Sequence, residues 1–231
     1  MQLAGIKVEF LRTIMHTSFT MKHFVQALIS ESIDAKRKLL HDDKLLQTIE
    51  DAANVILSSL QKGNKILFCG NGGSAADAQH LAAEFSGRFY INRRALPAEA
   101  LHVNTSYLTA VANDYGYDVV YARLVEGIGC KGDVLVGLST SGNSVNILKA
   151  FEAAKMNEMI TIALTGESGG VMKDAADYLI NIPSTVTPRI QESHILVGHI
   201  ICELVEAEYF REHQFSNNKT SRLPAFTQQA N

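Results

Sequence analysis

The sequence predicts an α/β fold in which a five-stranded parallel sheet is covered by helices on both faces. Three observations lead to this prediction. Short apolar runs recur along the chain, and stretches with the hydrophobic spacing of helices separate them. The runs are continuous rather than alternating, which is typical of parallel strands buried on both faces. No linker, repeat or low-complexity block interrupts the pattern between residues 22 and 212, so we expect a single domain over residues 21–212.

The elements follow in chain order. Two helices are expected before the first strand, over residues 22–40 and 44–61, because large aliphatic residues recur there at helical spacing. Strands are expected at residues 65–69, 98–103, 134–139, 160–165 and 178–182. Further helices are expected over residues 74–87, 144–156 and 188–211, with other helical stretches between the remaining strands.

The two ends of the chain differ from this pattern. Residues 1–20 are expected to be a poorly ordered extension, and they make a poor signal peptide because Glu9 interrupts the apolar stretch and only Lys7 and Arg12 are cationic. Met21 is a second candidate for the start of the chain. Residues 213–231 are polar and are expected to form a disordered tail.

Composition limits the classes of partner. The formal net charge is −3, so no overall basic field would attract nucleic acid or an anionic membrane, and neither is expected as a partner. No apolar run approaches transmembrane length. The three cysteines, Cys69, Cys130 and Cys202, match no zinc or disulfide spacing, which suits a reducing compartment and predicts a cytoplasmic protein.

Two loops resemble phosphate-binding turns. The first, residues 70–74, reads Gly-Asn-Gly-Gly-Ser, and the second, residues 139–144, reads Ser-Thr-Ser-Gly-Asn-Ser. Each lies between an expected strand and an expected helix, where N–H groups at the helix start and the positive end of its dipole favour an anion. In a parallel sheet both loops lie at the edge where ligands bind. We therefore expect this edge to hold a small anionic ligand.

Two other interpretations of the loops were considered. Each loop could be a tight turn whose Ser or Asn caps a helix, but two such loops at one sheet edge favour ligand binding. The first loop also fits a relaxed dinucleotide motif, which requires an acidic residue at the end of the next strand. Here that strand ends in His102, Val103 and Asn104, which argues against a nicotinamide enzyme.

Four polar side chains could form an acid–base or metal-binding group. His80 and Glu84 are four residues apart, so they lie about 40° apart on one helical face, and Gln191 and His199 lie about 80° apart on another. His194 is rotated about 140° from His199 and is expected to face elsewhere. Glu84 and His199 could serve as general base and acid, and the four together could bind a divalent metal.

The spacing also allows plainer interpretations. His80 and Glu84 could be an ordinary surface pair on one helix, and His199 could be a core histidine. Asn113 and Asp114 have the composition of a turn. Glu126, Glu203 and Glu206 are interpreted as residues of solvated helix faces.

Taken in order, these motifs resemble the phosphoheptose isomerase family. The resemblance rests on residues 69–80 with Glu84, Gly87 and Arg88, and on Asn113-Asp114, residues 139–144 and the stretch from Arg189 to His199. It covers residues 22 to about 210. It implies a sugar isomerase (SIS) domain with a flavodoxin-like three-layer fold, assembled as a homotetramer.

The resemblance also implies an activity and a site. Members convert the ketose sedoheptulose 7-phosphate to the aldose D-glycero-D-manno-heptose 7-phosphate by enediol-type proton transfer, the first step toward the ADP- or GDP-heptose of bacterial surface polysaccharides. Glu84 and His199 would be catalytic. One zinc ion per subunit would bind to His80, Glu84, Gln191 and His199. Substrate contacts would come from Asn71, Gly72, Gly73, Glu84, Asn113, Asp114, Ser139, Thr140, Ser141, Ser144 and Gln191.

A related branch of the same fold provides the alternative function. Its members are adaptors that bind the bacterial replication initiator protein and catalyse nothing. They have no acid at the position of Glu84, no histidine at that of His199 and no glycine at that of Gly73. All three residues are present here, which favours the enzyme.

Overall fold

The computed structural model describes residues 20–211. The expectations of an extension over residues 1–20 and a tail over 213–231 concern residues outside this range, apart from Thr20. Two helices come first, α2 (Met21–Leu40) and α3 (Asp43–Gln61). The remaining elements are β1 (Ile66–Gly70), α4 (Gly73–Ser86), β2 (Ala98–Ala100), α5 (Thr105–Tyr115), η1 (Tyr117–Val119), α6 (Val120–Ile128), β3 (Val134–Ser139), α7 (Val145–Met156), β4 (Ile160–Thr165), η2 (Val171–Asp174), β5 (Tyr178–Asn181) and α8 (Thr187–Tyr209).

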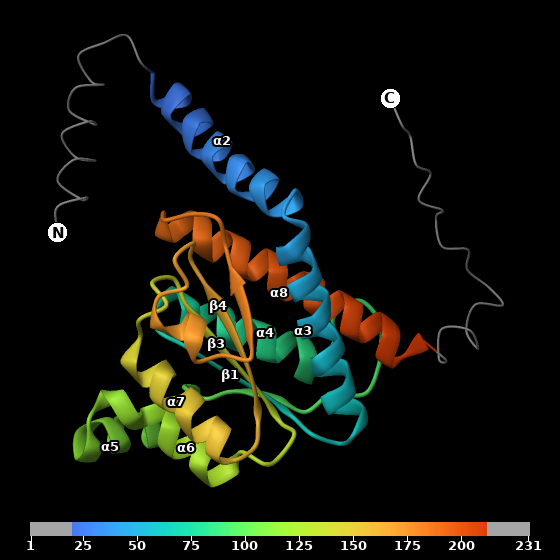
Figure 1. The fold of residues 1–231 in the computed structure, drawn as a ribbon, viewed down its shortest axis with the longest axis vertical. Coiled ribbons are helices and arrows are strands. Elements are labelled where there is room, and N and C mark those ends of the chain that lie inside the picture. The colour runs from blue at the N-terminus through green and yellow to red at the C-terminus, as the bar shows by residue number, and fades with distance from the viewer. Residues whose placement is uncertain (1–19, 212–231) are drawn as a thin grey trace.

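The strands form one parallel sheet in the order β2-β1-β3-β4-β5, which is the flavodoxin-like order. This confirms the predicted fold class. Successive residues of β1 point to opposite faces, so Phe68 packs with α3, α4 and α8 while Leu67 packs with α6 and α7. Figure 1 shows these two helical layers on either side of the sheet. The burial of both faces explains why the strands are continuous apolar runs.

The expected helices are confirmed to within one or two residues, and α5 and α6 are two of the further helical stretches that were expected without bounds. The sequence does contain signals for both. Asn104 caps α5 by accepting a hydrogen bond from the Tyr107 N–H at 3.0 Å, and α6 buries Val120, Tyr121 and Val125 on one face. Asn113 and Asp114, expected in a turn, belong instead to the last turn of α5.

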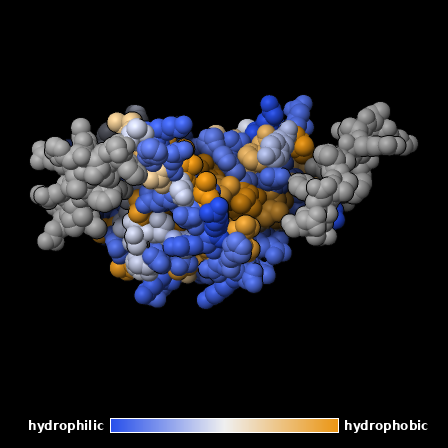
Figure 2. All heavy atoms as spheres, turned by 90° about the horizontal axis from the view of Figure 1, so that it is seen from above, coloured by the Kyte–Doolittle hydropathy of each residue, from blue (hydrophilic) through white to orange (hydrophobic). Residues whose placement is uncertain are grey.

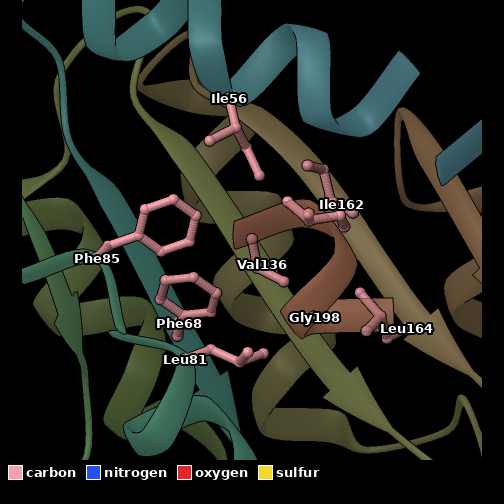
Figure 3. A pocket seen from close by; sticks show the side chains of 9 residues that line it. Ile56, Phe68, Leu81, Phe85, Val136, Ile162, Leu164 and Gly198 are labelled. Atoms are coloured by element: carbon pink, nitrogen blue, oxygen red, sulfur yellow. The ribbon is translucent and has the colours of Figure 1, made fainter. Parts of the chain in front are cut away.

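A small apolar cavity lies between the sheet and the layer of α3, α4 and α8. Figure 3 shows its lining, which includes Phe68, Leu81 and Gly198 and contains no polar side chain. Its volume is about 10 Å³, scarcely enough for one water molecule. The cavity is therefore a packing gap and offers no room for a polar ligand.

Among the helices of residues 20–211, none is long and apolar enough to cross a membrane.

Candidate active site

Three of the four expected metal ligands converge across two helices. The Nε2 atoms of His80 and His199 are 2.9 Å apart, and His80 Nε2 lies 3.2 Å from Glu84 Oε1. One ligand atom from each of the three side chains lies within 4.8 Å of the others. His80 and Glu84 come from α4 and His199 from α8, so the site forms only where these two helices pack together.

The close approach of α4 and α8 depends on the residues beside the histidines. Leu81 follows His80, and Gly198 precedes His199. A Cβ atom at Gly198 would lie 2.5 Å from Leu81 Cδ2, which is inside van der Waals contact. The absence of a side chain at Gly198 thus lets Leu81 pack directly on the backbone of α8. Figure 3 shows these two residues beside one another in the core.

The three side chains have the chemistry of a divalent metal site. Ligand atoms about 2.0–2.1 Å from a tetrahedral zinc ion lie about 3.3 Å from each other, close to the 2.9 and 3.2 Å separations observed. Two imidazoles and a carboxylate are also a common ligand set for catalytic zinc. The side chains remain reachable from solvent, since His80 is 49% and Glu84 22% exposed. The three side chains therefore fit a zinc ion.

Gln191 lies against the first loop. A Cβ atom at Gly73 would come within 2.4 Å of Gln191 Nε2, so this glycine leaves space for the glutamine side chain. Gly72 is needed for a different reason, because its φ of +56° is in the region that L-residues rarely adopt. The paired glycines of the first loop thus shape a turn and admit a side chain from α8.

The second loop gathers three hydroxyl groups. Ser139 Oγ lies 2.8 Å from Ser144 Oγ and 3.4 Å from Ser141 Oγ, and the backbone N–H of Asn143 donates to Ser141 Oγ at 3.2 Å. Thr140, between them, is partly buried. Because Gly70 pairs with Leu138 in the sheet, the first and second loops leave adjacent strands at the same edge. The predicted juxtaposition of the two loops is present.

Asn113 and Asp114 are the two expected site residues that lie on α5. Both are exposed on α5, and their hydrogen bond is to each other, from Asn113 Nδ2 to Asp114 Oδ1 at 2.9 Å. Within residues 20–211, no hydrogen bond or ion pair joins either of them to another expected site residue. Their assignment as substrate contacts rests on the resemblance.

His194 faces the sheet, as its rotation on the helix predicts. It is fully buried, and its Nε2 lies 3.1 Å from the carbonyl oxygen of Thr165. Burial lowers the pKa of His194 to about 4, although the hydrogen bond with Thr165 acts in the opposite direction. His194 is therefore a neutral core residue at pH 7 and takes no part in the site.

The interpretation of Glu206 as a solvated residue is wrong. Its carboxylate is buried and accepts hydrogen bonds from the N–H groups of Phe89, Tyr90 and Ile91 at 2.6–3.1 Å, and from Arg93 Nε at 2.6 Å. Burial alone would raise the pKa of Glu206, but these donors outweigh it and the pKa is lowered. A charged group becomes stable in the interior here because a loop wraps around it, which helical spacing does not reveal.

Arg93 joins this buried carboxylate to the helix that carries Glu84. Its guanidinium donates to the carbonyl oxygens of Phe85 at 2.9 Å and of Glu84 at 2.8 Å, at the end of α4. The same loop places the ring of Phe89 5.7 Å from the ring of His199. Neither Arg93 nor Glu206 belongs to a motif that predicts the site, although both lie beside it.

Comparison with known proteins agrees with this geometry. Residues 32–166 match the SIS domain family. The chain is 51% identical over 190 residues to phosphoheptose isomerase 2 of Campylobacter jejuni, covering 82% of this chain and 94% of that protein. It is 50% identical over 192 residues to the phosphoheptose isomerase of Clostridium acetobutylicum, covering 83% and 98%. Among solved structures, the phosphoheptose isomerase of Neisseria gonorrhoeae superposes with a TM-score of 0.77 at 46% identity, covering 81% of this chain and all of that one.

Proposed function

The chain belongs to the phosphoheptose isomerases of the SIS domain family, and we propose that it converts sedoheptulose 7-phosphate to D-glycero-D-manno-heptose 7-phosphate. The observation that carries the proposal is the convergence of His80, Glu84 and His199 where α4 and α8 pack together. Helix α4 begins at the first loop, and the side chain of Gln191, on α8, lies against Gly73 of the same loop. The product is a precursor of the activated heptose used in surface polysaccharides.

The reaction requires a proton to move between two adjacent carbons. We assign Glu84 to remove the proton from C1 of the ketose and return it to C2. We assign His199 to move the accompanying proton between the two oxygens, which completes the isomerisation without any external oxidant or reductant. Each well-placed acid or base contributes about 10²–10⁴-fold to the rate. The two groups come from separate helices, Glu84 from α4 and His199 from α8.

We include one zinc ion per subunit in the proposal. His80, Glu84 and His199 would hold it, with the amide oxygen of Gln191 as the fourth protein ligand. A bound zinc ion would polarise the carbonyl and hydroxyl oxygens of the substrate and stabilise negative charge on them. The supporting observation is the donor set itself, two imidazoles and a carboxylate within 4.8 Å of one another.

Removing one ligand tests the metal. After dialysis against zinc and then against buffer, the parent protein should retain about one zinc per chain, and His80→Ala should retain clearly less. Elemental analysis of both proteins measures this. The matched control is His41→Ala, because His41 is an exposed histidine at the end of α2. Equal zinc in His80→Ala and the parent, or a fully active parent that holds no metal and resists chelators, would contradict the assignment.

The second loop would hold the terminal phosphate. The chain has a net charge of −3, and neither loop contains Lys or Arg, so N–H groups at the start of α7 and the hydroxyls of Ser139, Thr140, Ser141 and Ser144 would bind the anion. Anchoring the phosphate there fixes which carbons of the sugar face Glu84.

Removing two of these hydroxyls should weaken binding. Hydrogen bonds to a charged group contribute about 1.5–3 kcal/mol each, so Ser141→Ala with Ser144→Ala should raise the dissociation constant about 10²-fold or more if the effects add. Calorimetric titration with sedoheptulose 7-phosphate measures the change, and Ser106→Ala on exposed α5 is the control. Equal binding of sedoheptulose and its 7-phosphate by the parent would refute the phosphate assignment.

We further propose that the enzyme is a cytoplasmic homotetramer. Helix α2 extends away from the sheet (Figure 1) and exposes Val25, Ile29 and Ile33, which lie on one face at spacings of four residues. Figure 2, which looks down on this end of the molecule, shows apolar surface in the middle of the face. An apolar stripe of this kind supports a contact between copies.

The three cysteines are all free thiols, which supports a reducing compartment.

Product analysis decides between the enzyme and the adaptor. The purified protein is incubated with sedoheptulose 7-phosphate, and NMR spectroscopy follows the appearance of an aldose. The enzyme predicts resonances of D-glycero-D-manno-heptose 7-phosphate. An unchanged spectrum, together with no binding of the sugar phosphate, would favour the adaptor that binds the replication initiator.

A further inference from the structure

The two loops are joined by a reciprocal pair of amide hydrogen bonds. Asn71 Nδ2 donates to Asn146 Oδ1 at 2.9 Å, and Asn146 Nδ2 donates to Asn71 Oδ1 at 2.9 Å. Asn71 belongs to the first loop. Asn146 lies in the first turn of α7, immediately after the second loop, and is only 3% exposed. The pair therefore connects segments 75 residues apart in the sequence.

The side chain of Asn71 is committed to the protein. Its Oδ1 also accepts a hydrogen bond from the hydroxyl of Tyr117 at 3.3 Å, so both acceptor positions of this oxygen are used. Tyr121 donates to the carbonyl oxygen of Gly70, the preceding residue, at 2.5 Å. These contacts come from η1, α6 and α7, and they hold the first loop in place.

The sheet alone does not fix the distance between the loops. The pairing of β1 with β3 ends where Gly70 of β1 lies opposite Leu138 of β3. Asn71 therefore lies beyond the last paired residue of β1. Past that point, among residues 20–211, the amide pair supplies the side-chain hydrogen bonds from the first loop to the start of α7. Because both hydrogen bonds run between the same two side chains, they fix the orientation as well as the separation of the amides.

We propose that Asn146 is a positioning residue for the isomerase: through Asn71 it sets the spacing of the first and second loops. This inference rests on the proposed function, in which both loops bind the substrate. Loops that hold non-reacting parts of the substrate contribute to binding in the ground state and the transition state alike. Loss of the pair should therefore raise KM and change kcat little, in contrast to loss of Glu84.

A double-mutant cycle tests the pair. Asn146→Ala removes both hydrogen bonds and leaves the amide of Asn71 without this partner, so KM should rise about 10-fold or more. Asn71→Ala should raise KM to a similar extent, and the double variant should be little worse than either single one. Asn146→Asp keeps the size of the side chain and one acceptor but loses the donor, so KM should rise here too even if Asn146→Ala fails to fold.

The control is an asparagine at the opposite end of the same helix. Asn157 ends α7, and its Nδ2 donates to the carbonyl oxygens of Val125 at 3.0 Å and Gly129 at 3.1 Å. Asn157→Ala should lower thermal stability and leave KM unchanged. Additive effects at Asn71 and Asn146, or an unchanged KM in both Asn146 variants of an active enzyme, would overturn the positioning role alone. An inactive parent would instead overturn the proposed function on which it rests.

Discussion

Glu84→Gln should lower kcat by at least about 10³-fold while leaving the fold intact, because the amide cannot carry the proton between C1 and C2. The substitution changes one atom of a partly exposed side chain, so packing of α4 against α8 is preserved. The NMR assay, run at saturating sedoheptulose 7-phosphate, measures turnover. His199→Ala should also lower turnover strongly, since it removes the proton carrier at the oxygens.

Glu84 is expected both to move the proton and to bind the metal, and the two roles can be separated. Loss of a ligand alone would be corrected by excess zinc, whereas loss of the base would persist at saturating zinc. The matched control is Glu203→Gln, the same chemical change at an exposed position of α8, which should be fully active. Near-normal turnover of Glu84→Gln would remove this residue from the mechanism.

The sheet could be predicted from the sequence because its determinants are local. Each strand is a continuous apolar run, and the burial of β1, β3 and β4 on both faces is the physical cause of that pattern. Parallel connection by helices then restricts the topology. The bounds of α5 could not be predicted because this helix is largely exposed, burying only Val111, so its apolar pattern is weak.

The site could be predicted only within each helix. Helical spacing places His80 beside Glu84 and separates His194 from His199, and the structure confirms both relations. Spacing carries no information about whether α4 and α8 meet. That contact depends on Leu81 packing against Gly198. Without the resemblance, the sequence would have left the pairing of the two helices open.

Asn146 and Glu206 show what spacing misses in polar residues. Each is buried because a partner distant in the sequence supplies its hydrogen bonds, Asn71 in one case and residues 89–93 in the other. A polar residue on a helix is usually solvated, so the interpretation of Glu206 as part of a solvated face follows the common case. Only the three-dimensional arrangement identifies these two as exceptions.

The largest expected effect on stability follows from the second of these residues. The side chains of Arg93 and Glu206 are 2% and 4% exposed, and Glu206→Gln would leave the guanidinium buried without its anion. Removing one member of a buried ion pair costs about 3–5 kcal/mol, so the free energy of unfolding at pH 7 should fall by about that amount. Urea denaturation at one fixed protein concentration measures it, since the proposed assembly would make stability depend on concentration.

The pH dependence of the difference in unfolding free energy between the parent and Glu206→Gln shows whether the charge of Glu206 causes it. The pKa of Glu206 is lowered in the folded protein, so the carboxylate stabilises the fold above the ordinary glutamate pKa, and this contribution is lost as pH falls through the folded value. The gap between the parent and Glu206→Gln should therefore be full at pH 7 and shrink in acid.

The control is Glu208→Gln, on the same helix as Glu206, which breaks an exposed ion pair with Arg211 whose N and O are 2.9 Å apart. Exposed pairs contribute at most about 1 kcal/mol, so this variant should unfold almost as the parent does. If Glu206→Gln were no less stable than Glu208→Gln, the loop of residues 87–93 would not depend on the buried carboxylate. The end of α4, and with it Glu84, would then have to be held by other contacts.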